Sequence, residues 1–192
     1  MPSLYLVTSG ASTTPEEPLH DLVRLLQNTW TVTVLSTPTG TRFHDLAAME
    51  ELTGEPVRVD FRLPGTGTSL PRADAILACP WSFNSTNKTA LGLADTFAVA
   101  LLCEMIGRGV PTVLVPKAGD GLAGHPAWEH NLHLLDQIPH LTLLRDPARE
   151  LPHWQQVADT LADLAEHPQP QPHAAVKLTV FHYGTSKCRD VT

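Results

Sequence analysis

The sequence has few cysteines and a shortage of positive charge. Cys79, Cys103 and Cys188 are odd in number and far apart, and they form neither a CxxC pair nor a zinc-ligand spacing. We therefore expect a reduced, cytoplasmic protein. Thirteen Lys and Arg residues stand against twenty Asp and Glu residues, which gives a formal net charge of −7. A chain this acidic lacks the basic surface of a nucleic-acid binder, and an anionic membrane surface would repel it.

Long apolar runs are also missing. The longest, residues 97–103, ends at Glu104 and is far shorter than the ~20 residues that a membrane-spanning helix needs. The first residues have no basic stretch and only a short apolar run, so we expect no secretory signal. What is present, 42% hydrophobic and 17% charged residues over 192 positions, is typical of one globular domain.

Short apolar runs alternate with helical patterns over residues 1–166. The apolar and β-branched runs predict strands at residues 4–8, 31–36, 57–61, 75–79, 112–115 and 141–144. Helical apolar spacing predicts helices at residues 16–28, 46–52, 85–107, 126–138 and 154–166. Short strands separated by helices indicate a parallel sheet with helices on both faces. We predict an α/β fold, a single doubly wound domain that is Rossmann-like or flavodoxin-like.

The composition changes after residue 166. Residues 167–173 read His-Pro-Gln-Pro-Gln-Pro-His, and repeated X-Pro steps favour an extended, semi-rigid linker. Residues 176–183 alternate enough to form an edge strand or an arm on a neighbouring subunit, with a loosely ordered tail as the alternative. We therefore divide the chain into a domain at 1–166 and a Pro-rich linker with a C-terminal tail at 167–192.

Two loops rich in hydroxyl groups follow the first two predicted strands. Open α/β sheets bind ligands beyond the carboxyl ends of their strands, so both loops belong to one edge. Small residues and hydroxyls before a helix can hold a phosphate, and because GxGxxG is absent a mononucleotide fits better than a dinucleotide. A helix start capped by Ser and Thr is the alternative. The candidates for ligand binding are Ser9, Gly10, Ser12, Thr37, Thr39 and Phe43.

A third segment follows the predicted strand at residues 75–79. It reads Pro80-x-Ser82-x-Asn84-Ser85-x-x-Lys88-x-Ala90-x-Gly92-x-Ala94-Asp95. This pattern resembles the signature of the homo-oligomeric flavin-containing cysteine decarboxylases. That family includes phosphopantothenoylcysteine decarboxylase and enzymes that oxidatively decarboxylate the C-terminal cysteine of lantibiotic precursors. The resemblance spans roughly residues 1–145, and a strand–turn–helix with incidental polar residues is the alternative.

The resemblance implies non-covalently bound FMN, which makes residues 1–166 an FMN-binding flavoprotein domain. The residues it implies near the phosphate and ribityl chain are Ser9, Gly10, Ser12 and Thr37. Those implied at the isoalloxazine are Pro80, Ser82, Asn84 and Ser85, and Asp95 is counted with the cofactor-binding residues. The family also implies a small-molecule or peptide substrate and a homo-oligomer, either a trimer or a dodecamer.

One family feature is missing from the segment that precedes the strand at residues 75–79. The decarboxylases carry a His shortly before an Ala-Asp pair, here Ala73-Asp74, and residues 57–74 contain no His. The nearest ionisable candidates are Asp60 and Arg62. Asp60 would serve as a base if burial raised its pKa, and Arg62 would hold a carboxylate or stabilise reduced flavin. The alternative for each is a solvated charge on an edge strand.

The family's substrate motif, Pro-x-Met-Asn-x-x-Met-Trp, is missing as well. Only Pro116 is kept, and Gly119 stands where an Asn would hold the substrate's carboxylate. The polar candidates left in this region are Lys117, Asp120 and His125. The histidines between residues 125 and 133 lack a carboxylate or Cys to complete a ligand set, so we predict no metal site.

Three functions are compatible with this sequence. The first is an FMN-dependent oxidoreductase or oxidative decarboxylase acting on a small or peptidic thiol, in which the protein positions flavin and substrate. The second is a flavin-binding or regulatory protein without catalysis. The third, a flavin prenyltransferase, needs a dimethylallyl-phosphate site for which the sequence gives little support. Substrate-dependent reduction of flavin separates the first from the other two.

Overall fold

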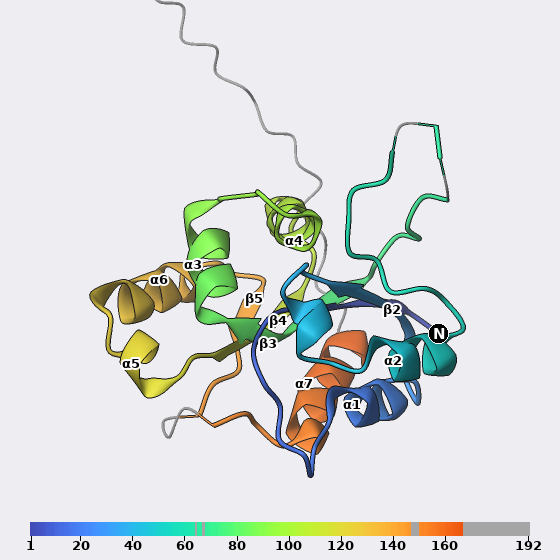
Figure 1. The fold of residues 1–192 in the computed structure, drawn as a ribbon, viewed down its shortest axis with the longest axis horizontal. Coiled ribbons are helices and arrows are strands. Elements are labelled where there is room, and N and C mark those ends of the chain that lie inside the picture. Colours follow the sequence, from blue (N-terminus) through green and yellow to red (C-terminus); the bar gives the residue numbers. More distant parts are fainter. Residues whose placement is uncertain (64, 67, 147–149, 167–192) are drawn as a thin grey trace, which may run out of the picture.

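A computed structural model describes residues 1–63, 65–66, 68–146 and 150–166 (Figure 1). Its strands form one parallel sheet in the order β2-β1-β3-β4-β5. They are β1 (Ser3–Thr8), β2 (Thr31–Ser36), β3 (Ala75–Ser82), β4 (Thr112–Lys117) and β5 (Leu141–Leu143). The strand order reverses direction at β1 and β3. The predicted doubly wound α/β fold is confirmed, while the predicted linker and the strand or arm at 176–183 lie outside the described residues.

Helices cover both faces of the sheet. They are α1 (Leu19–Leu26), α2 (Leu46–Thr53), α3 (Phe83–Leu91), α4 (Phe97–Gly107), α5 (Asp120–Ala123), α6 (Pro126–Asp136) and α7 (Trp154–Glu166), with a 3₁₀ turn η1 (Gly40–Arg42). In Figure 1, α1 and α7 lie on one side of the sheet and α4 on the other. None of the described helices is long and apolar enough to cross a membrane.

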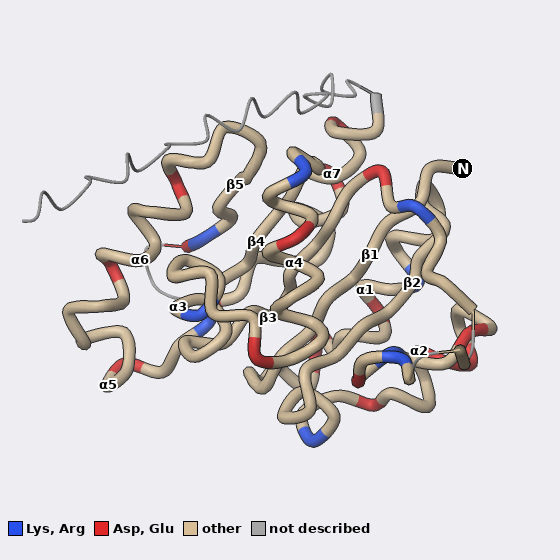
Figure 2. The backbone as a smooth tube through the Cα atoms, turned by 90° about the horizontal axis from the view of Figure 1, so that it is seen from above, with Lys and Arg blue, Asp and Glu red and all other residues tan. Residues whose placement is uncertain are grey.

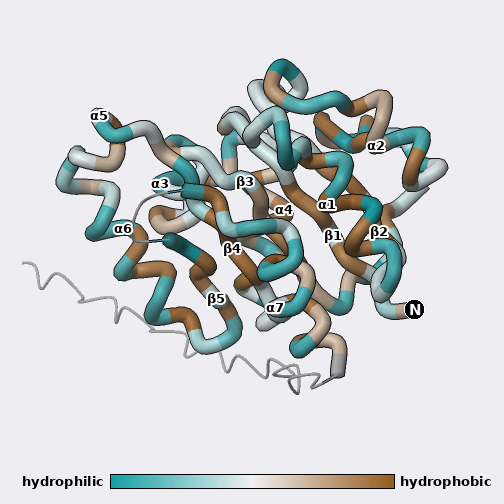
Figure 3. Tube along the Cα trace, turned by 90° about the horizontal axis from the view of Figure 1, so that it is seen from below, coloured by the Kyte–Doolittle hydropathy of each residue, from teal (hydrophilic) through white to brown (hydrophobic). Residues whose placement is uncertain are grey.

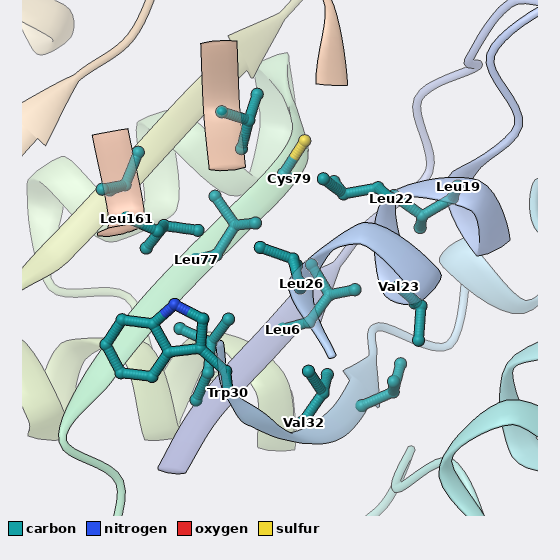
Figure 4. Close-up of a cluster of buried hydrophobic side chains, with 14 of the residues drawn as sticks. Leu6, Leu19, Leu22, Val23, Leu26, Trp30, Val32, Leu77, Cys79 and Leu161 are labelled. Carbon is teal, nitrogen blue, oxygen red and sulfur yellow. The ribbon is translucent and has the colours of Figure 1, made fainter. Parts of the chain in front are cut away.

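The side chains of β1 pack into two separate hydrophobic cores, one on each face of the sheet, because successive residues of a strand point to opposite sides. Leu4 and Leu6 pack with α1 and α7, whereas Tyr5 and Val7 pack with α4. Figure 4 shows Leu6 and Leu77 of the sheet meeting Leu22 and Leu26 of α1. Figure 3 shows the hydrophobic stretches gathered along the strands, with hydrophilic stretches around them. Burial of this apolar surface is the main force that holds the helices on the sheet.

Two predicted elements are wrong. Residues 57–61 form no strand but a single bridge between Leu35 and Arg58. The chain beyond this bridge is exposed, and Phe61 packs against Phe97 of α4 rather than continuing the pairing with β2. The helix predicted at 85–107 is two helices, α3 and α4. Gly92 ends α3 at φ 68°, and the N–H of Leu93 donates to the carbonyl of Lys88 at 2.8 Å, which closes the helix end. The helix at 16–28 starts later than predicted, at Leu19.

Candidate functional site

The loops beyond the carboxyl ends of β1 to β4 enclose a cavity of about 730 Å³. It lies where the strand order reverses, which is the usual ligand site of an open α/β sheet. We call it the carboxyl-edge cavity. It is lined by Gly10, Ala11, Ser12, Thr37, Pro38, Thr39, Phe43, Ser82, Phe83, Asn84, Ser85, Lys88, Thr96, Val99, Lys117, Ala118, Gly119 and Leu122.

Ser9 ties the first loop to the end of β3. Its hydroxyl donates to the carbonyl of Pro80 at 2.9 Å and accepts the N–H of Ser82 at 2.8 Å. Ser9 is fully buried and does not line the cavity. A buried hydroxyl that satisfies two backbone groups has a structural role, and this role explains Ser9 and Pro80 without direct contact to a ligand. These two residues therefore position the loops on which other candidates stand.

The first and second loops touch each other closely, and glycine makes this contact feasible. A Cβ on Gly10 would lie 2.6 Å from Cγ2 of Thr39, and one on Gly40 would lie 3.1 Å from Cα of Ser9. Thr37 holds the second turn, since its hydroxyl accepts the N–H of Gly40 at 3.1 Å. The result is a narrow floor of backbone and hydroxyl groups at one end of the carboxyl-edge cavity.

His44 hydrogen-bonds to the backbone of the first loop and so helps to hold this floor in place. Its Nε2 lies 3.0 Å from the carbonyl oxygen of Ser9, and because a carbonyl only accepts, the proton of the neutral ring is assigned to Nε2. Burial lowers the pKa of His44, while the hydrogen bond to Ser9 acts in the opposite direction. The neutral ring is therefore the form that the fold favours.

The start of α3 forms the third wall of the cavity. Ser82 is the N-cap of α3, and its hydroxyl accepts the N–H of Ser85 at 3.4 Å. Trp81 is fully buried in the core that faces α4, and its indole N–H donates to Thr89 at 3.1 Å. Asn84 is exposed and lines the cavity. The motif thus combines capping and packing residues with side chains at the cavity wall.

The charged side chains that line the carboxyl-edge cavity are basic. Its described walls contain Lys88 and Lys117 and no Asp, Glu, His or Cys. Lys88 is ion-paired at 2.6 Å with Asp95, and the hydrogen bond from Lys88 lowers the pKa of that carboxyl. Asp95 does not line the cavity, so it acts on the site through Lys88. Such a cavity favours an anionic ligand with hydrogen-bond acceptors.

The structure does not bring the three candidate catalytic residues into this cavity. Asp60 and Arg62 line a different cavity beside α4. His125 is exposed and is the N-cap of α6, where its Nδ1 accepts the N–H of Ala127 at 3.1 Å. Its ring contacts Phe83 edge-on, with ring centroids 6.1 Å apart. Catalysis by these residues stays a prediction.

Eight of the predicted cofactor-binding residues do meet in the cavity: Gly10, Ser12, Thr37, Thr39, Phe43, Ser82, Asn84 and Ser85. Thr96 and Val99 were missed, because the two-helix arrangement that exposes the start of α4 was predicted as one helix. Gly92 was the signal that could have revealed the break. In the part of the chain that the structure describes, no three His, Cys, Asp or Glu residues gather as a metal site.

Residues 2–166 match the family model named Flavoprotein. This chain belongs to the Flavoprotein family. The match spans the predicted domain and confirms the flavoprotein resemblance that the motif from Pro80 to Asp95 predicts. A search of curated protein sequences returned no match.

Solved structures of other proteins share the fold of this flavoprotein. A mutant of PPC decarboxylase is 18% identical with a TM-score of 0.70, over 87% of this chain and 99% of that chain. The FMN-dependent cysteine decarboxylase SpaF is 17% identical with a TM-score of 0.67, over 86% and 97%. HAL3 from Cryptococcus neoformans is 18% identical with a TM-score of 0.68, over 88% and 99%. At these identities the likeness establishes the fold.

Proposed function

We propose that this flavoprotein binds FMN in the carboxyl-edge cavity. The observation that carries the proposal is a wall of hydroxyl and backbone groups with two lysines and no carboxylate among the described lining residues. The cavity's 730 Å³ lies within the range of about 300–1,000 Å³ that is usual for small-molecule and cofactor sites. FMN-dependent cysteine decarboxylases are among the proteins that share this fold, which supports the choice of flavin.

The residues present fit the phosphate end of FMN. Ser12, Thr37 and Thr39 offer hydroxyls, and Gly10 leaves room for backbone N–H groups to approach an anion. This end is the narrow floor between the first two loops. We therefore assign the phosphate and ribityl chain to this floor, where hydrogen bonds rather than a lysine would hold the charge.

The other walls fit a flat ring. Phe43 is 45% exposed and offers an aromatic face, and Asn84 offers an amide at the start of α3. Among the described residues, no partner satisfies the buried hydroxyl oxygen of Thr96, which also belongs to the cavity lining. A buried polar group without a partner is costly, and a ring carbonyl or nitrogen of flavin would relieve that cost.

The reaction that we propose is the oxidation, with or without loss of CO₂, of a small or peptidic thiol that carries a carboxylate. Bound FMN would supply a two-electron acceptor, which no side chain provides. Lys88 and Lys117 are the residues of this chain suited to hold the substrate's carboxylate. None of Asp60, Arg62 and His125 lines the cavity, so this reaction is proposed without them. We propose a homo-oligomer on the resemblance to the homo-oligomeric decarboxylases.

A flavin-binding protein without catalysis is the second candidate. It is favoured by one observation: the described walls of the cavity hold no carboxylate, imidazole or thiol to move a proton. The two candidates make the same prediction for flavin binding and opposite predictions for substrate turnover. They therefore require one experiment with two stages.

The first stage records visible absorbance of the purified full chain, with FMN added if the protein is colourless. Flavin absorbance that stays with the protein through gel filtration supports the proposed binding, and failure to retain added FMN overturns it. The second stage adds cysteine-ended peptides under anaerobic conditions. Loss of oxidised-flavin absorbance supports the oxidoreductase, and a peptide ending in serine is the matched control. Unchanged absorbance with every thiol supports the non-catalytic protein.

A further inference from the structure

A second cavity, of about 850 Å³, lies between α4 and the segment that leads into β3. It shares no lining residue with the carboxyl-edge cavity. Phe97 and Leu101 line this cavity, whereas Thr96 and Val99 line the other one. The two cavities therefore lie along different sides of α4, and a ligand in one does not occupy the other.

Arginine dominates the charge of the second cavity, which we call the arginine cavity. Four arginines line it, Arg58, Arg62, Arg72 and Arg108, against the two carboxylates of Asp60 and Glu104. The chain as a whole has a formal charge of −7, and Figure 2 shows acidic and basic residues dispersed over the body of the molecule. A local excess of guanidinium groups in an acidic protein is an electrostatic feature that attracts anions.

The arginines stand on opposite walls. Arg58, Arg62 and Arg72 come from the segment before β3, and Arg108 comes from the end of α4. Arg58 donates to the hydroxyl of Thr68 at 3.3 Å, which orients its guanidinium without cancelling the charge. Arg108 is ion-paired with Glu104. A ligand between the walls would therefore meet guanidinium groups from both sides.

Between these charges α4 supplies an apolar wall. Phe97, Leu101 and Met105 of α4 line it, together with Val110. Phe61 packs edge-on against Phe97 with ring centroids 5.3 Å apart, although 59% of Phe61 is exposed. A pocket with an apolar lining and a few convergent charged groups is suited to a small molecule that has both an apolar body and a charged end.

We propose that the arginine cavity binds a small organic acid, a carboxylate attached to an apolar, aromatic body. The planar guanidinium fork matches a carboxylate with two parallel hydrogen bonds. Asp60 and Glu104 in the same walls reduce the net positive charge, and the apolar side chains of α4 gain no contact from inorganic phosphate, which has no apolar body. The apolar body contacts Phe97 and Leu101. This site is separate from FMN binding and does not depend on it.

The test is isothermal titration calorimetry of the full chain with 4-phenylbutyrate, and with neutral 4-phenylbutanol as the matched ligand. We expect the acid to bind at least about tenfold more tightly than the alcohol, the effect of one charge-assisted contact. Saturating FMN is expected to leave the affinity for the acid unchanged. Equal affinity for acid and alcohol, displacement by FMN, or no heat at millimolar acid would each overturn the proposal.

Variants locate the binding. Arg72→Met and Arg58→Met are each expected to lower the affinity for 4-phenylbutyrate by about tenfold, because each removes one guanidinium from the wall. Arg24→Met is the control, since Arg24 is an exposed arginine of α1 paired with Asp21 and outside the cavity. The proposed site is contradicted if Arg24→Met lowers the affinity as much as the cavity variants do, or if neither cavity variant lowers it. Displacement of the acid by equimolar inorganic phosphate contradicts the carboxylate specificity.

Discussion

Replacing Ser9 with alanine removes one hydroxyl that joins two parts of the chain far apart in sequence. The hydroxyl donates to the carbonyl of Pro80 at 2.9 Å and accepts the N–H of Ser82 at 2.8 Å. Alanine fills nearly the same space and leaves both backbone groups without this partner. Because Ser9 is fully buried, water reaches this point poorly.

The cost follows from those two groups. A buried backbone group left without a partner costs about 1–3 kcal/mol, and we take a total near 2–4 kcal/mol because Ser82 is only partly buried. Domains of this kind have free energies of unfolding of about 5–15 kcal/mol. Ser9→Ala is therefore expected to lose a large part of the stability, and the loss is expected in the absence of any ligand.

Urea denaturation of the ligand-free protein measures this loss as a lower midpoint. Ser12→Ala is the matched control, because Ser12 is exposed and lines the carboxyl-edge cavity. We expect Ser12→Ala to weaken FMN binding and to leave the free energy of unfolding unchanged. A free energy of unfolding for Ser9→Ala within about 0.5 kcal/mol of the unaltered protein would refute the assignment of Ser9 as a structural link.

Three further predictions follow from single residues. Gly10→Ala is expected to lower the affinity for FMN by about tenfold in a fluorescence titration, since its Cβ would lie 2.6 Å from Thr39 and narrow the floor of the cavity. An unchanged affinity would contradict the assignment of the phosphate to this floor. Gly92→Ala is expected to lower the free energy of unfolding by about 1 kcal/mol, measured by thermal unfolding, because φ is 68° at Gly92. Gly107→Ala is the control and is expected to cause no such loss, because Gly107 lies in a helical backbone. Burial lowers the pKa of His44 below its usual 6.5, so stability is full above that pH and falls as pH drops below it. His44→Gln should flatten that part of the pH profile, and an unchanged slope would place the titrating group elsewhere.

The motif around α3 shows why the site could be read only in part from the sequence. Its pattern was specific enough to predict the flavoprotein family, which the family match confirms. The same pattern does not separate the roles of its members. Ser82 both caps α3 and lines the cavity, Asn84 lines the cavity, and the buried Pro80 does neither, yet all three count equally as motif residues. Capping and ligand contact use the same polar side chains, and only packing decides between them.

The spacing of apolar residues does not reveal where α4 begins. Apolar residues continue through Leu91 and Leu93, so the spacing favours one long helix. Both leucines are exposed, and the positive φ of Gly92 turns the chain between them. Thr96 and Val99 reach the cavity wall because of that turn. The positive φ of Gly92 is therefore the reason why Thr96 and Val99 line the cavity.

The sequence by itself determined the α/β class, the edge of the sheet that carries the site and the hydroxyl-rich loops at that edge. These follow from local patterns, because strand and helix periods and the carboxyl ends of parallel strands are properties of short segments. Only the tertiary structure decided that Asp60 and Arg62 face a separate arginine cavity on the other side of α4. That outcome depends on how residues 58–62 and 68–73 pack against a helix formed more than twenty positions later, and no local pattern encodes such a contact.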